Sequence, residues 1–140
     1  MISFQSQTIT FKPKDVRKTK KWLSELVSRE GFELAALNYI FMTDDELLEM
    51  NKSYLNHDTY TDIITFDTSD VEEEIEGDIF ISIDRVKENA KTFSVDFNTE
   101  LRRVLAHGAL HLCGYPDKKP EEAKKMRAKE DEYLELYLAV

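Results

Sequence analysis

The order in which strand-like and helix-like segments follow one another is the feature of this sequence that most constrains its fold. Segments rich in β-forming residues or with alternating apolar residues predict strands, and apolar residues every three to four positions predict helices. We expect strands over residues 2–11, 32–42, 62–66 and 77–83. We expect helices over residues 14–30, 43–54, 84–93 and 99–113, and from residue 120 almost to the C-terminus. Four strands and about five helices, in mixed order and without a repeat or linker, predict one α+β domain over residues 1–140 with a four-stranded mixed β-sheet flanked by helices.

Short-range signals mark several of the expected ends. Gly31 and Gly114 follow periodic segments, as residues that end a helix in a left-handed conformation do. Thr43, followed three positions later by Glu46, predicts a capping box at the start of a helix. The acidic stretch over residues 70–76 is expected to be a surface loop.

Composition and charge exclude several classes of protein. The chain of 140 residues is 41% hydrophobic, enough for one core, and its single cysteine excludes an internal disulfide framework. No apolar run approaches the ~18 residues needed to span a bilayer, and the N-terminal segment lacks the features of a secretory signal. The formal net charge of −9 argues against nonspecific coating of nucleic acid but is compatible with a site-specific nuclease. We therefore expect a cytoplasmic protein that does not bind a membrane.

Two of the three histidines, His107 and His111, lie four positions apart in an expected helix. This spacing places both imidazoles on one face, where they can bind the same metal ion. Gly114 then ends the helix and the chain turns back to Asp117, which completes the pattern H-x-x-x-H-x-x-G-x-x-D. Three protein ligands leave a fourth tetrahedral position for water, as in catalytic zinc sites. We expect one zinc ion at these three residues; two histidines with unrelated roles are the alternative that the spacing leaves open.

The residue after the first histidine separates two kinds of hydrolase. Zinc peptidases with this histidine spacing carry a glutamate there as the general base, whereas this chain has Gly108. Phosphodiester hydrolysis depends less on that base, because a metal ion itself acidifies water and offsets charge on phosphoryl oxygens. The sequence therefore favours a nuclease over a metallopeptidase.

Three segments carry motifs that occur together in one family. Residues 107–115 read HGALHLCGY, residues 51–66 read NKSYLNHDTYTDIITF, and residues 77–82 read GDIFIS. They resemble the patterns HGxLHLxGYDH, NxxYRxxDxPTDVLSF and GDIxIS of the YbeY family of rRNA-maturation endoribonucleases. Met126 and Glu130 also match the pattern of the family's last helix.

This resemblance implies a small metal-dependent RNA hydrolase. Such an enzyme would process the 3′ end of small-subunit ribosomal RNA and take part in ribosome quality control, with ribosomal RNA or the small ribosomal subunit as its partner. The resemblance also implies a zinc ion at the positions of the family's three histidines, which are His107, His111 and Asp117 here. The proposed nucleophile is a metal-activated water, and no side chain is assigned as the proton acceptor.

The chain departs from the family pattern at three positions. Asp117 stands in place of the third histidine; a carboxylate is a regular zinc ligand, but its charge makes the ion a weaker Lewis acid. The alternative is a site that has lost its third ligand and binds the metal weakly or not at all. Leu55 stands in place of an arginine that would lie near the scissile phosphate, and Tyr60 in place of a turn proline. Leu55 leaves open a catalytically weak or inactive ribosome-assembly factor of the same fold.

Other polar residues surround the expected metal segment. Asp62 and Asp78 lie at the edges of expected strands and are candidates to orient a ligand histidine through a hydrogen bond. Four cations flank the segment in the sequence and are candidate contacts for RNA phosphates, although a solvated surface fits them equally well: Arg102, Arg103, Lys118 and Lys119.

Overall fold

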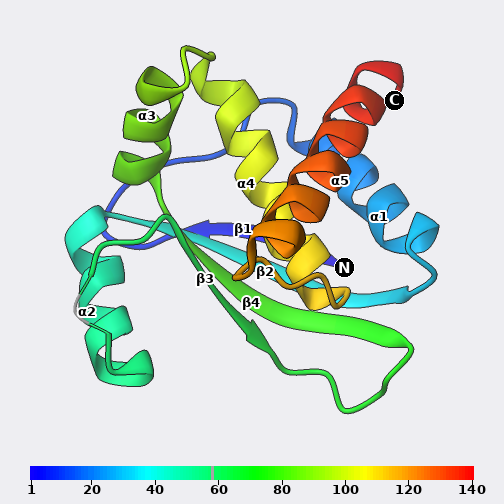
Figure 1. Ribbon diagram of the computed structural model, residues 1–140, viewed down its shortest axis with the longest axis horizontal. Helices are drawn as coiled ribbons and strands as arrows, with labels where there is room; N and C mark the ends of the chain where they lie inside the picture. The colour runs from blue at the N-terminus through cyan, green and yellow to red at the C-terminus, as the bar shows by residue number, and fades with distance from the viewer. Residues whose placement is uncertain (58) are drawn as a thin grey trace.

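The computed structural model describes residues 1–57 and 59–140 (Figure 1). Asp58, which belongs to one of the segments that resemble the family, lies outside the described residues. No helix in these two ranges is long and apolar enough to cross a membrane. The elements follow in the order β1 (Ile2–Ser6), α1 (Val16–Arg29), β2 (Glu33–Met42), α2 (Asp44–Leu55), β3 (Ile63–Asp67), β4 (Glu74–Ser82), α3 (Ile83–Thr92), α4 (Phe97–Leu112) and α5 (Pro120–Ala139).

The four strands form one mixed sheet in the order β1-β2-β4-β3. The pairs β1–β2 and β2–β4 are parallel, and β3 runs antiparallel to β4. In the central strand β4, Ile79 lies opposite Tyr39 of β2 and Thr65 of β3. The predicted α+β fold with a four-stranded mixed sheet is therefore confirmed.

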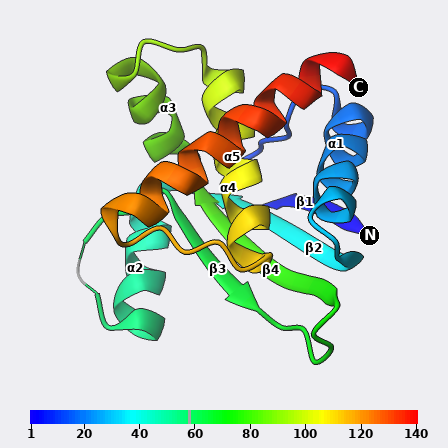
Figure 2. The same ribbon diagram turned by 45° about the vertical axis from the view of Figure 1, so that its right-hand side comes forward.

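The helices cover the two faces of the sheet unequally. Helices α1, α4 and α5 lie on one side, with α3 beside α4, and α2 lies alone on the other side (Figures 1 and 2). Because successive side chains of a strand point to opposite faces, Ile79 and Ile81 of β4 enter the main core under α4. Phe80 between them packs instead with a smaller cluster around Leu47 of α2.

Helix α4 approaches the sheet closely at Gly108. A Cβ atom at this position would lie 3.0 Å from two side-chain atoms of Ile79 and 3.1 Å from Ile63. The residue after the first histidine therefore packs against the sheet, and a glutamate there, as in a zinc peptidase, would have to displace the side chains of Ile79 and Ile63. This close approach also fixes the end of α4, and with it His107 and His111, against the sheet.

Several predicted boundaries are confirmed. The capping box is present, with the Thr43 side chain accepting from the Glu46 N–H and the Glu46 carboxylate accepting from the Thr43 N–H. Gly31 and Gly114 follow α1 and α4 with positive φ of 89° and 103°, as a glycine after a helix end does.

Other boundaries were predicted wrongly. Strand β1 ends at Ser6 rather than residue 11, because the chain turns at Thr8, which has a φ of 62°. Helix α1 begins two residues later than expected, after Asp15 with a φ of 51°. The acidic stretch is not entirely a loop, since β4 already begins at Glu74, which pairs in parallel with Glu33 of β2.

Candidate active site

The end of α4 and the turn after it bring the three predicted ligands to one cavity. Gly114 donates its N–H to the His111 carbonyl at 3.0 Å, and this tight helix end reverses the chain. Asp117 thereby returns to α4, where its Oδ2 lies 3.1 Å from Nε2 of His107. His107, His111 and Asp117 all line a cavity of about 490 Å³, here called the front cavity, together with the end of α2 and the start of β3.

The imidazole of His107 is oriented from behind by Glu130 of α5. Its Nδ1 lies 2.7 Å from Oε2 of Glu130, whose side chain is only 6% exposed. Arg103, one helical turn before His107, binds the other oxygen of that carboxylate at 3.0 Å. A carboxylate that accepts from Nδ1–H fixes the tautomer and leaves Nε2 free to bind a ligand.

The charges around His107 favour its protonated form. Burial by itself lowers the pKa of His107, but the hydrogen bond and charge of Glu130, together with the charges of Asp117 and Asp62, raise it above its usual value. The same negative surroundings attract a bound cation in place of the proton, because metal ions and protons compete for the imidazole nitrogen.

The donor atoms in the front cavity suit a zinc ion. The separation of 3.1 Å between His107 and Asp117 is close to the roughly 3.4 Å between two donors on a tetrahedral zinc ion with bonds of about 2.0–2.2 Å. Within residues 1–57 and 59–140, no three histidine, cysteine, aspartate or glutamate side chains are arranged to hold a metal ion as they stand. His111 lines the same cavity and is exposed. The three-ligand zinc site stays a prediction, and its donor chemistry fits.

Asp62 lies close to His107 but is not its hydrogen-bond partner. It lines a second cavity of about 350 Å³ between α3, α4 and α5, here called the back cavity, with Glu100, Glu130 and His107. Burial raises the pKa of Asp62, and the charge of His107 partly opposes this rise. The contribution of Asp62 to His107 is therefore electrostatic, while the direct contact comes from Glu130.

The prediction that Asp78 orients a ligand histidine is wrong. Its neighbour Ile79 points toward α4, so the alternation of β4 places Asp78 on the opposite face of the sheet. There its carboxylate accepts a hydrogen bond from the Asn38 side chain at 3.0 Å.

The four cations proposed to bind RNA have different environments. Arg103 is bound to Glu130 and, at 2.7 Å, to Asp131, so its guanidinium is occupied and the prediction for this residue is wrong. The guanidinium of Arg102 packs over the ring of Tyr137 at 4.3 Å, toward the far end of α5, and its contact with RNA stays a prediction. Lys118 lines the front cavity and Lys119 is exposed at the start of α5; their contacts with RNA stay predictions.

Sequence reasoning marked two parts of this site without showing what they contact or line. The match of Glu130 to a family pattern marked the residue without indicating that it binds His107, which lies 23 positions away. The wall of the front cavity opposite α4 is formed by Leu55, His57 and Tyr60, of which Leu55 is 42% exposed. The last residue of α2 therefore presents an apolar side chain where the family pattern has an arginine.

Comparisons with known proteins agree on one family and on the overall fold. The chain matches the family model described as Endoribonuclease YbeY over residues 1–137. It is 50% identical over 135 residues to a protein named Endoribonuclease YbeY from Cytophaga hutchinsonii, covering 96% of this chain and 94% of the relative. Another protein of that name, from Flavobacterium psychrophilum, is 49% identical over 137 residues, or 98% and 96% of the two chains. The solution structure of TM1509 from Thermotoga maritima superposes with a TM-score of 0.69 at 30% identity, covering 99% of this chain and 90% of that one.

Proposed function

This chain belongs to the endoribonuclease YbeY family, and on that premise we propose that it is a zinc-dependent endoribonuclease that matures ribosomal RNA. Within that role we propose processing of the 3′ end of small-subunit rRNA and a part in ribosome quality control. Its partner is then ribosomal RNA or the small ribosomal subunit, and its place of action is the cytoplasm. The observation that carries the proposal is the pairing of His107 Nε2 with Asp117 in a cavity that His111 also lines.

The residues of the site divide the work of hydrolysis between them. His107, His111 and Asp117 would hold the ion, which supplies Lewis acidity toward a water molecule and a phosphoryl oxygen. Glu130 keeps the Nδ1 proton of His107 in place, so that Nε2 faces the front cavity. Lys118 at the cavity wall is placed to attract a phosphate of the RNA backbone.

Zinc content and RNA cleavage by the purified protein test this proposal together. We expect near-stoichiometric zinc in the parent protein and little in His111→Ala, because His111 supplies a ligand. His57→Ala is the matched control, since His57 lines the same cavity outside the proposed ligand set and its removal should leave the zinc content unchanged. A precursor carrying the 3′ end of small-subunit rRNA should be cleaved by the parent, and a chelator should stop the cleavage until zinc is restored. Equal zinc in the parent and His111→Ala would end the proposal of a metal site.

A second candidate function is a ribosome-assembly factor in which catalysis has faded. Leu55 favours it, because an apolar side chain faces the front cavity where a cation would bind the scissile phosphate. Zinc-dependent cleavage of the precursor by the unmodified chain rejects this candidate, whereas zinc binding and tight RNA binding without cleavage support it. The packing of Gly108 against Ile79 argues against the third candidate, a metallopeptidase.

A further inference from the structure

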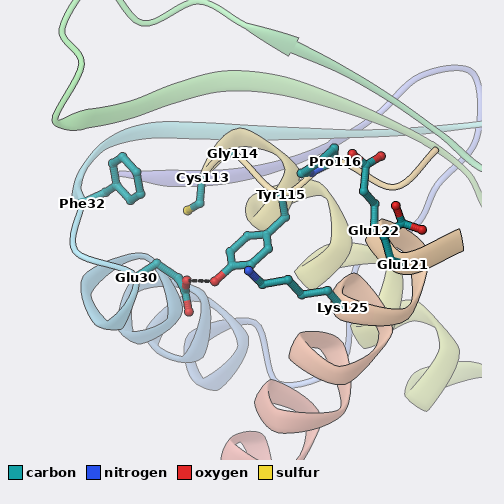
Figure 3. A pocket seen from close by; sticks show the side chains of 9 residues that line it. All are labelled: Glu30, Phe32, Cys113, Gly114, Tyr115, Pro116, Glu121, Glu122 and Lys125. Carbon is teal, nitrogen blue, oxygen red and sulfur yellow. Dashed lines mark hydrogen bonds between the residues drawn. The ribbon is translucent and has the colours of Figure 1, made fainter. Parts of the chain in front are cut away.

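A buried carboxylate far from the histidines in sequence is connected to the turn that carries Asp117. Glu30 caps the end of α1, and its side chain is 8% exposed. Its Oε1 accepts a hydrogen bond from the Tyr115 hydroxyl at 2.6 Å, drawn in Figure 3. Its Oε2 accepts from the Tyr133 hydroxyl and from Nζ of Lys129 at 3.2 Å, both on α5.

The Tyr115 side chain anchors the segment between α4 and α5. Figure 3 shows its ring reaching from the turn across a cavity toward Glu30. That cavity, of about 520 Å³, is also lined by Pro116 and Lys125. The neighbours of Tyr115 in the turn, Gly114 and Pro116, are exposed. Asp117, the proposed third zinc ligand, follows two residues after Tyr115, so the position of its carboxylate depends on where the turn is held.

We propose that Glu30 is a positioning residue for the zinc site, and that it acts through Tyr115 by holding the turn that places Asp117 beside His107. The inference rests on the proposed zinc site and adds to it a residue that belongs to none of the ligand-bearing segments. The three donors explain how Glu30 does this. Hydrogen bonds to an ionised carboxylate are stronger than neutral ones, and the low exposure of the Glu30 side chain limits the access of competing water.

The charge state of Glu30 agrees with this role. Burial alone would raise the pKa of Glu30, but the hydrogen bonds from Tyr115, Tyr133 and Lys129 outweigh it and lower the pKa below the usual value. The carboxylate is therefore ionised at neutral pH. Tyr133 and Lys129 join Glu30 to α5, whereas Tyr115 joins it to the turn. Mutations can therefore separate the packing of the helices from the placement of the turn.

The test compares two tyrosines that donate to the same carboxylate. Tyr115→Phe removes the hydroxyl that holds the turn, and Tyr133→Phe removes a hydroxyl on α5 that does not touch it. Zinc affinity is measured by competition with a chromogenic chelator, and folding by thermal unfolding. We expect Tyr115→Phe to weaken zinc binding about 10-fold, the lower end of the effect of outer contacts on metal sites, and Tyr133→Phe to change it less than about 2-fold. Glu30→Gln should weaken it in the same direction and replaces Tyr115→Phe if that variant fails to fold.

A double-mutant cycle separates positioning from a general loss of stability. If Tyr115 acts on zinc through Asp117, Tyr115→Phe should have no further effect on affinity in an Asp117→Ala background. Equal effects of Tyr115→Phe and Tyr133→Phe, or an undiminished effect of Tyr115→Phe without Asp117, would overturn the role of Glu30 and leave the zinc site standing. A parent protein that binds no zinc, or an Asp117→Ala variant that binds it as tightly as the parent, would overturn the zinc site and this inference together.

Discussion

Two cavities meet at the imidazole of His107, and they differ in how their walls are held. In the back cavity, Glu130 is buried and binds both His107 and Arg103, and two more carboxyl groups, those of Asp62 and Glu100, lie beside them. These residues come from α4, from α5 and from the residue just before β3, and the direct contact with the His107 ring comes from Glu130 of α5.

In the front cavity, several of the lining side chains lie at the surface. His111 is exposed, Leu55 is 42% exposed and Tyr60 is 51% exposed. The two cavities therefore suit different roles. Contacts in the back cavity orient His107 before a metal ion or RNA binds, and the front cavity has room for a metal ion and an RNA strand. Preorganised contacts behind a reacting centre lower the cost of reorganisation during the reaction.

His107 and Asp117 both line the two cavities, but only His107 is also bound by Glu130, so its removal should have the largest effect. We expect His107→Ala to lose zinc and to lower cleavage of the rRNA precursor by at least about 10³-fold, the scale on which enzymes respond to the loss of one catalytic group. Steady-state cleavage and elemental analysis of the same preparation measure both quantities. Activity within 10-fold of the parent would show that the two cavities do not share a functional centre at this residue.

Substitution of Glu130 tests whether a contact in the back cavity affects zinc binding in the front cavity. Glu130→Gln keeps the size of the side chain but removes the charge that holds the Nδ1 proton of His107, so zinc affinity should fall about 10- to 100-fold. Asp131→Asn is the matched control, because Asp131 binds the same arginine from a side chain that is 60% exposed and does not contact His107 through the interactions described. Its zinc affinity should stay within about 2-fold of the parent, and chelator competition distinguishes the two variants. Equal losses in both would assign the effect to Arg103 instead.

The part of this site that follows from local sequence could be predicted, and the part that depends on tertiary contacts could not. The spacing of His107 and His111, the glycine after α4 and the return to Asp117 all lie within eleven residues, and the structure brings these three residues to one cavity. The partner of Arg103 comes from another helix, 27 positions away, so the sequence alone could not show that this cation is occupied.

The fold shows the same limit. Element order and caps are local and were predicted, whereas the early start of β4 at Glu74 depends on pairing with Glu33, 41 positions earlier in the chain. The error at Asp78 had a different cause. Successive side chains of a strand point to opposite faces, so once Ile79 is assigned to the core under α4, Asp78 belongs on the other face of the sheet.

Leu55 tests the front cavity alone. Leu55→Arg places a guanidinium at the end of α2. Because a guanidinium can form two parallel hydrogen bonds to one phosphate, cleavage of the precursor should rise about 10-fold. Zinc content should not change, because residue 55 is outside the ligand set. Leu55→Gln serves as the control for a longer polar side chain without charge and should leave the rate within about 2-fold. An unchanged rate in Leu55→Arg would show that the missing cation does not limit this enzyme.

Substitution of Glu100 measures how much the negative charges gathered in the back cavity destabilise the fold. Of the four predictions, this one has the smallest expected effect. It is 4% exposed in the first turn of α4. Burial raises the pKa of Glu100 above its usual value, and the charge of Arg103 only partly opposes this. A carboxyl group whose pKa is higher in the folded than in the unfolded protein stabilises the fold when it is protonated. This stabilisation is complete below the pKa of the unfolded state, about 4.3, and is lost as the pH rises through the pKa of the folded state. Glu100→Gln should therefore raise the unfolding temperature at pH 7 by about 2–4 °C and by less at pH 4.

The exposed Glu88 on α3 is the matched control for this change of charge. Glu88→Gln should shift the unfolding temperature by less than about 1 °C at either pH, since surface substitutions have small effects. The dipole of α4 favours a negative charge in its first turn by about 0.3–1 kcal/mol, which limits the gain from Glu100→Gln without reversing it. A lower unfolding temperature for Glu100→Gln at pH 7 would mean that the ionised carboxylate of Glu100 stabilises the fold. The positive charges in the back cavity would then outweigh the repulsion between its carboxylates.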